Sequence, residues 1–314
     1  MRNPVFDLLR IILTFLVVNI HIRIIIGQPT SNFLEQYVWF AIPFFVVLSF
    51  YFSSNKNLMA RIKRLFLPLI FWSAIGFIIH PELINAKNIS LQLFTGHVVN
   101  TPLYYLILLV WFTIINWLVN KFPEKIKIAI YSLIIFTTFF LEYSRTNFNF
   151  FYPMISVVEK SYGRFIELIK FVPVGLAFAY LAKKLKGFHF FLLSVLSFIF
   201  YLFSKNIPQP PDFHYSGLKI FFGTIMVFSL VLWSSKIKVT NNINQVISTF
   251  GQYSFGVYLS HYPILEFFVK IFPNIKPVIS SQRILFLFAY TIFLYAFCLL
   301  FDVVSRKRLS LLIK

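Results

Sequence analysis

Ten stretches of the chain are apolar over a length that predicts membrane-spanning helices. A helix needs roughly 20 mainly apolar residues to cross the hydrocarbon core of a bilayer. The predicted helices are residues 5–27, 37–54, 65–80, 102–119, 126–142, 164–182, 188–204, 218–235, 250–271 and 284–304. This pattern predicts an all-α polytopic membrane protein with about ten transmembrane helices, and with the longer loops at 81–101, 143–163, 205–217 and 272–283.

The first apolar stretch is interpreted as a retained helix. It is longer than the apolar region of a secretory signal, it is interrupted by charged residues, and no small-residue cleavage pattern follows it. The chain also shows no internal repeat and no polar stretch long enough for a soluble domain. We therefore expect one integral-membrane domain over residues 1–314, with no fused soluble domain.

The composition supports a membrane protein. Hydrophobic residues make up 59% of the 314 residues, charged residues only 12%, and the mean hydropathy is +0.79. A soluble core cannot bury that much apolar surface, whereas lipid can cover it. The single cysteine, Cys298, lies inside an apolar stretch and cannot form a disulfide within the chain.

The formal charge of +19 is interpreted through membrane topology. With a cytoplasmic N-terminus, well over half of the 29 Lys and Arg residues fall in the short loops on the inner side. Such a bias is typical of cytoplasmic loops, so it favours cytoplasmic N- and C-termini. No basic soluble module is present to bind nucleic acid, and we expect no nucleic-acid partner.

The first predicted helix carries a polar stripe. At about 100° per residue, Asp7, Arg10, Thr14 and His21 fall near one line along it. Ionisable groups inside a membrane are costly and usually face the protein interior or a wet cavity. His21 can exchange a proton near neutral pH, as a general base must.

Structural interpretations of these residues stay open. Asp7 and Arg10, three positions apart, can neutralise one another. His21 can be a buried imidazole with satisfied hydrogen bonds. Arg23, near the outer end of the helix, is interpreted as extending its charge to the membrane interface.

Two other predicted helices carry polar groups that could line a common cavity. In "SFGVYLSHYPI", Ser254, Tyr258 and His261 share one helix face. Ser49 lies in the otherwise apolar "FAIPFFVVLSFYF". Serine and tyrosine also serve helix packing in membranes, and that interpretation stays open here.

A basic segment, "KNLMARIKRLFLP", precedes the third predicted helix. Arg61 and Arg64 lie three positions apart, and guanidinium groups pair well with phosphate. The segment can therefore dock a phosphorylated cytoplasmic donor, or it can be an ordinary positive-inside loop. The sequence shows no phosphate-binding glycine loop, dinucleotide motif, zinc-ligand spacing or nucleophile elbow, so neither a nucleotide hydrolase nor a metalloenzyme is indicated.

Four motifs in sequence order resemble the membrane-bound acyltransferase family 3, the O-acyltransferases of bacterial surface polysaccharides. Arg10 and His21 match the Arg and His of the family's first helix. "PFFVVLSFYF" is similar to the end of its second helix. "RIKRLFLP" is similar to its Arg-x-x-Arg segment, and "SFGVYLSHYPI" to its late Ser-x-x-x-Tyr-Leu-x-His-x-Pro segment.

The resemblance implies an O-acyltransferase, most simply an O-acetyltransferase. It would move an acyl group from cytoplasmic acyl-CoA, through a central channel between the helices, to a hydroxyl of a surface or exported glycan or lipid-linked sugar. His21 would be the general base or a transient acyl carrier, helped by Arg10 and Asp7. Arg61 and Arg64 would bind the CoA phosphates, and Ser49, Ser254, Tyr258 and His261 would lie nearby. No metal is implied, and the expected location is the bacterial cytoplasmic membrane.

Two other classes of function are consistent with buried arginine and histidine. A transporter or flippase of lipid-linked sugars would move its substrate without covalent change, although no inverted repeat supports this class. A non-catalytic sensor or assembly scaffold would leave acylation of surface sugars unaffected when His21 is replaced. The acyltransferase is the function that we carry forward.

Overall fold

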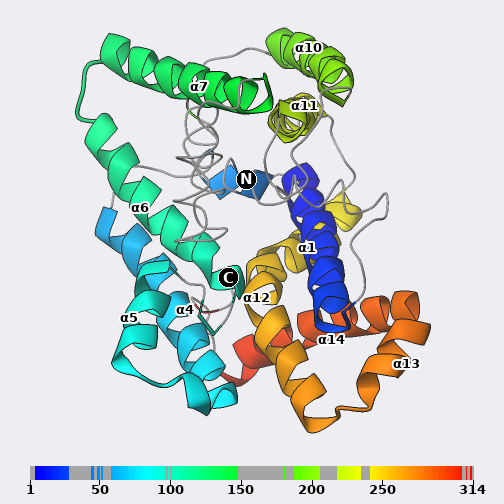
Figure 1. Ribbon diagram of the computed structural model, residues 1–314. Coiled ribbons are helices and arrows are strands. Elements are labelled where there is room, and N and C mark those ends of the chain that lie inside the picture. Colours follow the sequence, from blue (N-terminus) through cyan, green and yellow to red (C-terminus); the bar gives the residue numbers. More distant parts are fainter. Residues whose placement is uncertain are drawn as a thin grey trace. The chain divides into compact units, whose positions relative to one another are not determined.

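The computed structural model describes residues 4–27, 44–45, 48–49, 51, 58–95, 98–99, 101–147, 180, 187–205, 218–234, 241–305, 309 and 312. Within these residues all regular structure is helical, and there is no strand (Figure 1). The chain forms two compact units. The first comprises Met1–Ala41, Met59–Ile107 and Lys238–Lys314, and the second comprises Ile42–Leu58 and Leu108–Ile237. The all-α prediction is confirmed for the described part of the chain.

The first unit is built on three long helices from opposite ends of the sequence. Helix α1 (Pro4–Ile25) packs along α12 (Asn241–Ile271), and α14 (Arg283–Val304) packs against both. The short α13 (Ile275–Ser281) joins α12 to α14 (Figure 1). The N-terminal and C-terminal segments of the chain are thereby brought into one core.

The same unit contains the segment that follows the basic motif. Helix α4 (Leu58–Ile79) leads through a 3₁₀ turn, η1 (Pro81–Leu83), into α5 (Ala86–Thr95). The buried Gln92 side chain of α5 donates to the Ser73 hydroxyl of α4 at 3.0 Å. A second 3₁₀ turn, η2 (Thr101–Leu103), contacts α12 and precedes α6.

The second unit contains the middle of the chain. Helices α10 (Gly187–Lys205) and α11 (Leu218–Ser234) lie side by side, and α7 (Glu124–Asn147) contacts α11. Helix α6 (Tyr104–Val119) starts in the first unit and continues in the second.

The predicted helices agree with the structure in most places where it describes them. Helices α1, α6, α7, α10, α11 and α14 match the corresponding predictions closely. Helix α4 starts at Leu58 rather than residue 65, and α12 starts at Asn241 rather than 250, because polar helical turns extend beyond the apolar stretch. The predicted helices at 37–54 and 164–182 fall mostly outside the described residues.

Two predicted loops are wrong. The segment 81–101 contains η1, α5 and the start of η2, and 272–283 contains α13. These helices are too short to cross a bilayer, so a search for span-length apolar stretches does not detect them. Hydrogen bonds such as that between Gln92 and Ser73 hold α5 against α4 instead.

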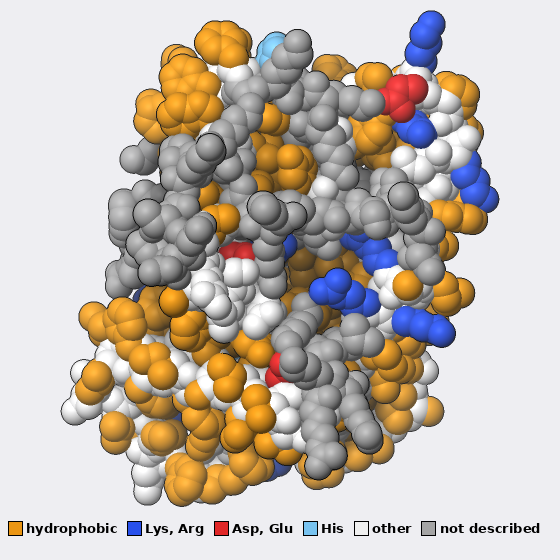
Figure 2. Space-filling model, turned by 180° about the vertical axis from the view of Figure 1, so that it is seen from behind, with side chains coloured by type: hydrophobic (Ala, Val, Ile, Leu, Met, Phe, Trp, Pro, Cys, Tyr) orange, Lys and Arg blue, Asp and Glu red, His pale blue; other side chains and the backbone are white. Residues whose placement is uncertain are grey.

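Three helices of the described part are long and apolar enough to cross a membrane: Pro4–Ile26, Leu58–Ile79 and Arg283–Val304. Tyr104–Val119 and Phe188–Phe203 are shorter apolar helices. Large apolar side chains such as Ile78, Phe288 and Ile292 are exposed, and such side chains cover much of the face in Figure 2. Exposed apolar surface of this extent fits lipid contact.

The core of the first unit lies where α1, α12 and α14 meet. Val18 and Ile22 of α1, Val257 and Leu265 of α12, and Leu294 of α14 belong to one buried cluster. The free Cys298 is also in it. This packing fixes which face of α1 looks toward α12, and it therefore positions the polar stripe of α1.

Candidate active site

His21 and His261 form the centre of the candidate site. The His21 Nδ1 atom lies 2.9 Å from the His261 Nε2 atom, although the two residues are 240 positions apart in sequence. The two rings lie 4.8 Å apart between centroids. His261 is fully buried and His21 is half-buried. The stripe on α1 therefore faces α12, and the His21 ring is packed against protein.

The hydrogen bonds of this pair select the position of each proton. The His261 Nδ1 atom lies 2.6 Å from the Tyr258 carbonyl oxygen, which can only accept, so this nitrogen carries a proton. In the neutral ring the His261 Nε2 atom is then an acceptor. The His21 Nδ1–H group donates to it and lies 3.1 Å from the Val17 carbonyl oxygen as well.

This arrangement leaves the His21 Nε2 atom with its lone pair in the neutral ring. A histidine whose first nitrogen is held by an orienting acceptor presents its second nitrogen as a base. His261 thus holds the tautomer and direction of His21, and the backbone carbonyl of Tyr258 holds His261. In this tautomer the pair can accept a proton at the His21 Nε2 atom.

Tyrosine residues surround the pair. The Tyr262 ring lies 5.4 Å from the His21 ring at an interplanar angle of 80°, the edge-on arrangement that aromatic pairs prefer. The buried Tyr290 hydroxyl of α14 donates to the His261 carbonyl oxygen at 2.5 Å. These contacts fix the helix segment that carries His261 against α1 and α14.

Asp7 and Arg10 form an ion pair on α1, nearer to its N-terminus than His21. The Arg10 Nη1 atom donates to the Asp7 Oδ1 atom at 2.9 Å, and Asp7 is fully buried. One turn further along, the buried Thr14 hydroxyl donates to the Ser254 carbonyl oxygen at 3.5 Å, a long hydrogen bond. The expected pairing of Asp7 with Arg10 is confirmed, and the stripe continues from this pair toward His21.

Tyr105 of α6 connects the basic segment of α4 with the site. The Arg10 and Arg61 guanidinium groups both act electrostatically on the buried Tyr105 hydroxyl. The Tyr105 ring in turn lies 5.5 Å from the Tyr258 ring, nearly perpendicular to it. Arg61 is half-buried and Arg64 is exposed on the first turns of α4. Arg61 and Arg10 thus both act on the electrostatic environment of the Tyr105 hydroxyl.

The hydroxyl groups of two other predicted site residues form hydrogen bonds between helices. The Ser254 hydroxyl bonds the Tyr295 hydroxyl at 3.0 Å. The Tyr258 hydroxyl donates to the Pro102 carbonyl oxygen at 3.2 Å. Both hydroxyls thus join helices, in agreement with the packing interpretation. The remaining predicted residue, Ser49, belongs to the second unit.

The interpretation of Arg23 is wrong in the structure. Its residue exposure is 4%, so the side chain does not extend into an interface as expected. Arg283 at the start of α14 acts on it electrostatically. Among the described residues, no group of three or more His, Cys, Asp or Glu side chains is placed to hold a metal ion.

The sequence interpretation missed Tyr105 and Tyr262. Both lie in apolar stretches, "NTPLYYLILLV" and "SHYPI", where tyrosine is ordinarily assigned to packing. A buried tyrosine usually finds a polar partner for its hydroxyl, and this was the available signal. Arg10 of α1 and Arg61 of α4 act on Tyr105, and the Tyr262 ring faces His21 of α1, so only the folded chain identifies these contacts.

Comparison with known proteins identifies the family of the chain. The family model described as an acyltransferase domain, that of acyltransferase family 3, matches residues 3–303. No curated protein and no solved structure matches the chain. The matched region includes α1, α4 and α12, which carry His21, Arg61 and His261. The chain belongs to acyltransferase family 3 and is a membrane acyltransferase.

Proposed function

We propose that the protein is an O-acyltransferase, most simply an O-acetyltransferase, that uses cytoplasmic acyl-CoA to acylate a hydroxyl of a surface or exported glycan. The observation that carries this proposal is the hydrogen bond of 2.9 Å between His21 and His261. It presents the His21 Nε2 atom as a base, and acyl transfer to a hydroxyl needs a base at the attacking oxygen.

The proposed reaction needs one proton acceptor that later returns the proton. The His21 Nε2 atom takes the proton of the acceptor hydroxyl while the hydroxyl oxygen attacks the thioester carbonyl carbon. The new C–O ester bond forms, the C–S bond breaks, and the departing thiolate takes the proton from the His21 imidazolium. Free CoA thiol and the acyl ester are the products. The His261 Nε2 atom and the Val17 carbonyl oxygen accept from the charged ring throughout.

An alternative order gives the same products. The His21 Nε2 atom attacks the thioester, carries the acyl group, and passes it to the hydroxyl. Both orders use the same His21 Nε2 atom and the same orientation by His261. Both also place the acyl donor near α1.

Arginines supply the proposed binding of the donor. Arg61 and Arg64 at the start of α4 offer guanidinium groups to the phosphates of CoA. Arg10, held by Asp7, adds a further positive charge, which acts on Tyr105 as that of Arg61 does. With N- and C-termini in the cytoplasm, the start of α4 faces the cytoplasmic donor.

The test is mass spectrometry of the surface glycans of the cells that carry the gene, with and without the protein. We expect acyl esters that disappear without the protein and with His21→Ala or Arg10→Ala, while these variants still insert into the membrane. If cells that express the wild-type protein carried the same acyl esters as cells without it, the proposal would be excluded. A glycan that moves across the membrane without covalent change would support a flippase instead.

A further inference from the structure

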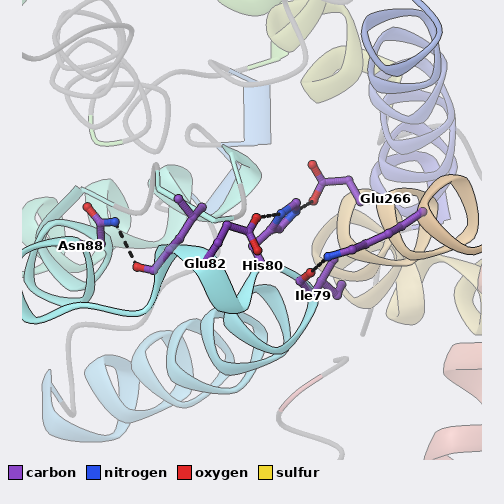
Figure 3. Close-up of polar contacts among 7 residues, drawn as sticks. Ile79, His80, Glu82, Asn88 and Glu266 are labelled. Atoms are coloured by element: carbon purple, nitrogen blue, oxygen red, sulfur yellow. Dashed lines mark hydrogen bonds and ion pairs between the residues drawn. The ribbon is translucent and has the colours of Figure 1, made fainter.

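A second polar cluster lies between the end of α4 and the last turns of α12 (Figure 3). The His80 Nε2 atom lies 3.2 Å from the Glu266 Oε2 atom of α12, and the His80 Nδ1 atom lies 3.1 Å from the Glu82 Oε1 atom of η1. The Lys270 Nζ group donates to the Ile79 carbonyl oxygen. Two side chains of α12 are thus tied to the end of α4.

The cluster reaches the histidine pair through one side chain. Tyr262 lies one helical turn before Glu266 on the same face of α12, where side chains four positions apart meet, and its side chain interacts with the Glu266 carboxylate. The Tyr262 ring is the one that stands edge-on against His21. Glu266 therefore holds the hydroxyl end of a tyrosine whose ring forms one wall around the proposed base.

We propose that Glu266 is a positioning residue for His21, acting through Tyr262. This inference rests on the proposed function, since it concerns the base of that reaction. Glu266 fixes the tyrosine side chain, and the tyrosine ring limits rotation of the His21 ring away from the direction that His261 sets. A small misplacement of a catalytic group slows a reaction strongly, by about 100-fold for a shift of about 1 Å.

His80 links Glu266 to the end of α4. Both of its ring nitrogens face carboxylates, so the protonated ring, which donates from both, satisfies both contacts. Glu82 is exposed, and its own backbone N–H and the His80 side chain lower the pKa of its carboxyl. Both carboxylates contact His80, but Glu266 is mostly enclosed and Glu82 is open to solvent. Replacing Glu82 is therefore a suitable control for replacing Glu266.

The experiment compares full-length variants in detergent-solubilised membranes, with radiolabelled acetyl-CoA as donor and the membrane glycan fraction of the cells that carry the gene as acceptor. For Glu266→Leu and Tyr262→Phe we expect kcat to fall by about tenfold or more, with the KM for acetyl-CoA unchanged. The double variant is expected to be no slower than the slower single variant, because both break one link.

Glu82→Gln is the matched control and keeps the wild-type kcat. Tyr262→Phe keeps the ring and its packing, so it tests the link even if Glu266→Leu folds poorly. A wild-type kcat in Glu266→Leu overturns the proposal, and so does a slow Glu266→Leu beside a wild-type Tyr262→Phe. In either case, loss of transfer in His21→Ala shows that the proposed function stands, whereas no transfer by the wild-type protein removes that function itself.

Discussion

Gly251 of α12 faces Asp7 of α1 so closely that a β-carbon at residue 251 would lie 2.4 Å from the Asp7 Cβ atom and 2.9 Å from its Oδ1 atom. The Asp7 Cβ atom is joined directly to the α1 backbone and cannot swing aside. The two helices must therefore meet here at a residue without a side chain. This approach buries Asp7 and sets the level at which the stripe of α1 meets α12.

Gly251→Ala should push α1 and α12 apart. Overpacking of a well-packed contact costs about 1–3 kcal/mol, so we expect a lower thermal midpoint in detergent. Transfer should fall as well, because His21 and His261 lie on the same two helices. The exposed Thr249 gives a matched control, and Thr249→Ala should change stability by no more than about 0.5 kcal/mol. Equal midpoints for the two variants would contradict the close approach.

The orientation of His21 by His261 gives a second prediction. His261→Leu removes one of the two acceptors of the His21 Nδ1–H group and leaves only the Val17 carbonyl oxygen, so the ring is held less firmly and the proton can move to the other nitrogen and block the base. We expect acetyl transfer to fall by about 100-fold or more, within the range found for loss of a group that orients a histidine. His261→Gln keeps an acceptor oxygen and should retain more activity than the leucine variant. Equal rates of radiolabelled transfer in both variants would show that His261 does not set the tautomer.

The arginines of α4 give a third prediction. Arg61→Ala with Arg64→Ala should raise the KM for acetyl-CoA by about tenfold or more, because two charge-assisted bonds to phosphate are lost. Lys63→Ala removes a positive charge from an exposed side chain of the same segment, and it should leave that KM nearly unchanged. If the double arginine variant and Lys63→Ala changed the KM for acetyl-CoA equally, the segment would be an ordinary positively charged cytoplasmic loop rather than a specific phosphate-binding site.

A fourth prediction concerns the buried carboxylate of α14. The Tyr253 hydroxyl donates to the Asp302 Oδ2 atom at 3.0 Å, and both residues are buried. Tyr253→Phe removes the donor and keeps the ring. A hydrogen bond to a charged group contributes about 1.5–3 kcal/mol, so the thermal midpoint should fall clearly. An unchanged midpoint would mean that Asp302 does not depend on this bond.

The sequence by itself determined the helical class and the chemistry available to the site. A long apolar helix depends on the residues within its own stretch of sequence. Helices α1, α6 and α14 therefore form where the apolar pattern predicted them. The spacing of Asp7 and Arg10 likewise predicted a pair that forms within one helix. The short helices α5 and α13 escaped prediction because neither is long enough to show a spanning pattern.

Only the tertiary structure decided which polar groups meet. His21 and His261 are 240 positions apart, and their hydrogen bond depends on how α1 and α12 pack, with Gly251 at a point of close approach. Tyr105 and Tyr262 gained their roles in the same way, from partners on other helices or from the ring that they face. Periodicity along a chain describes one helix at a time, whereas packing between helices is a property of the whole fold.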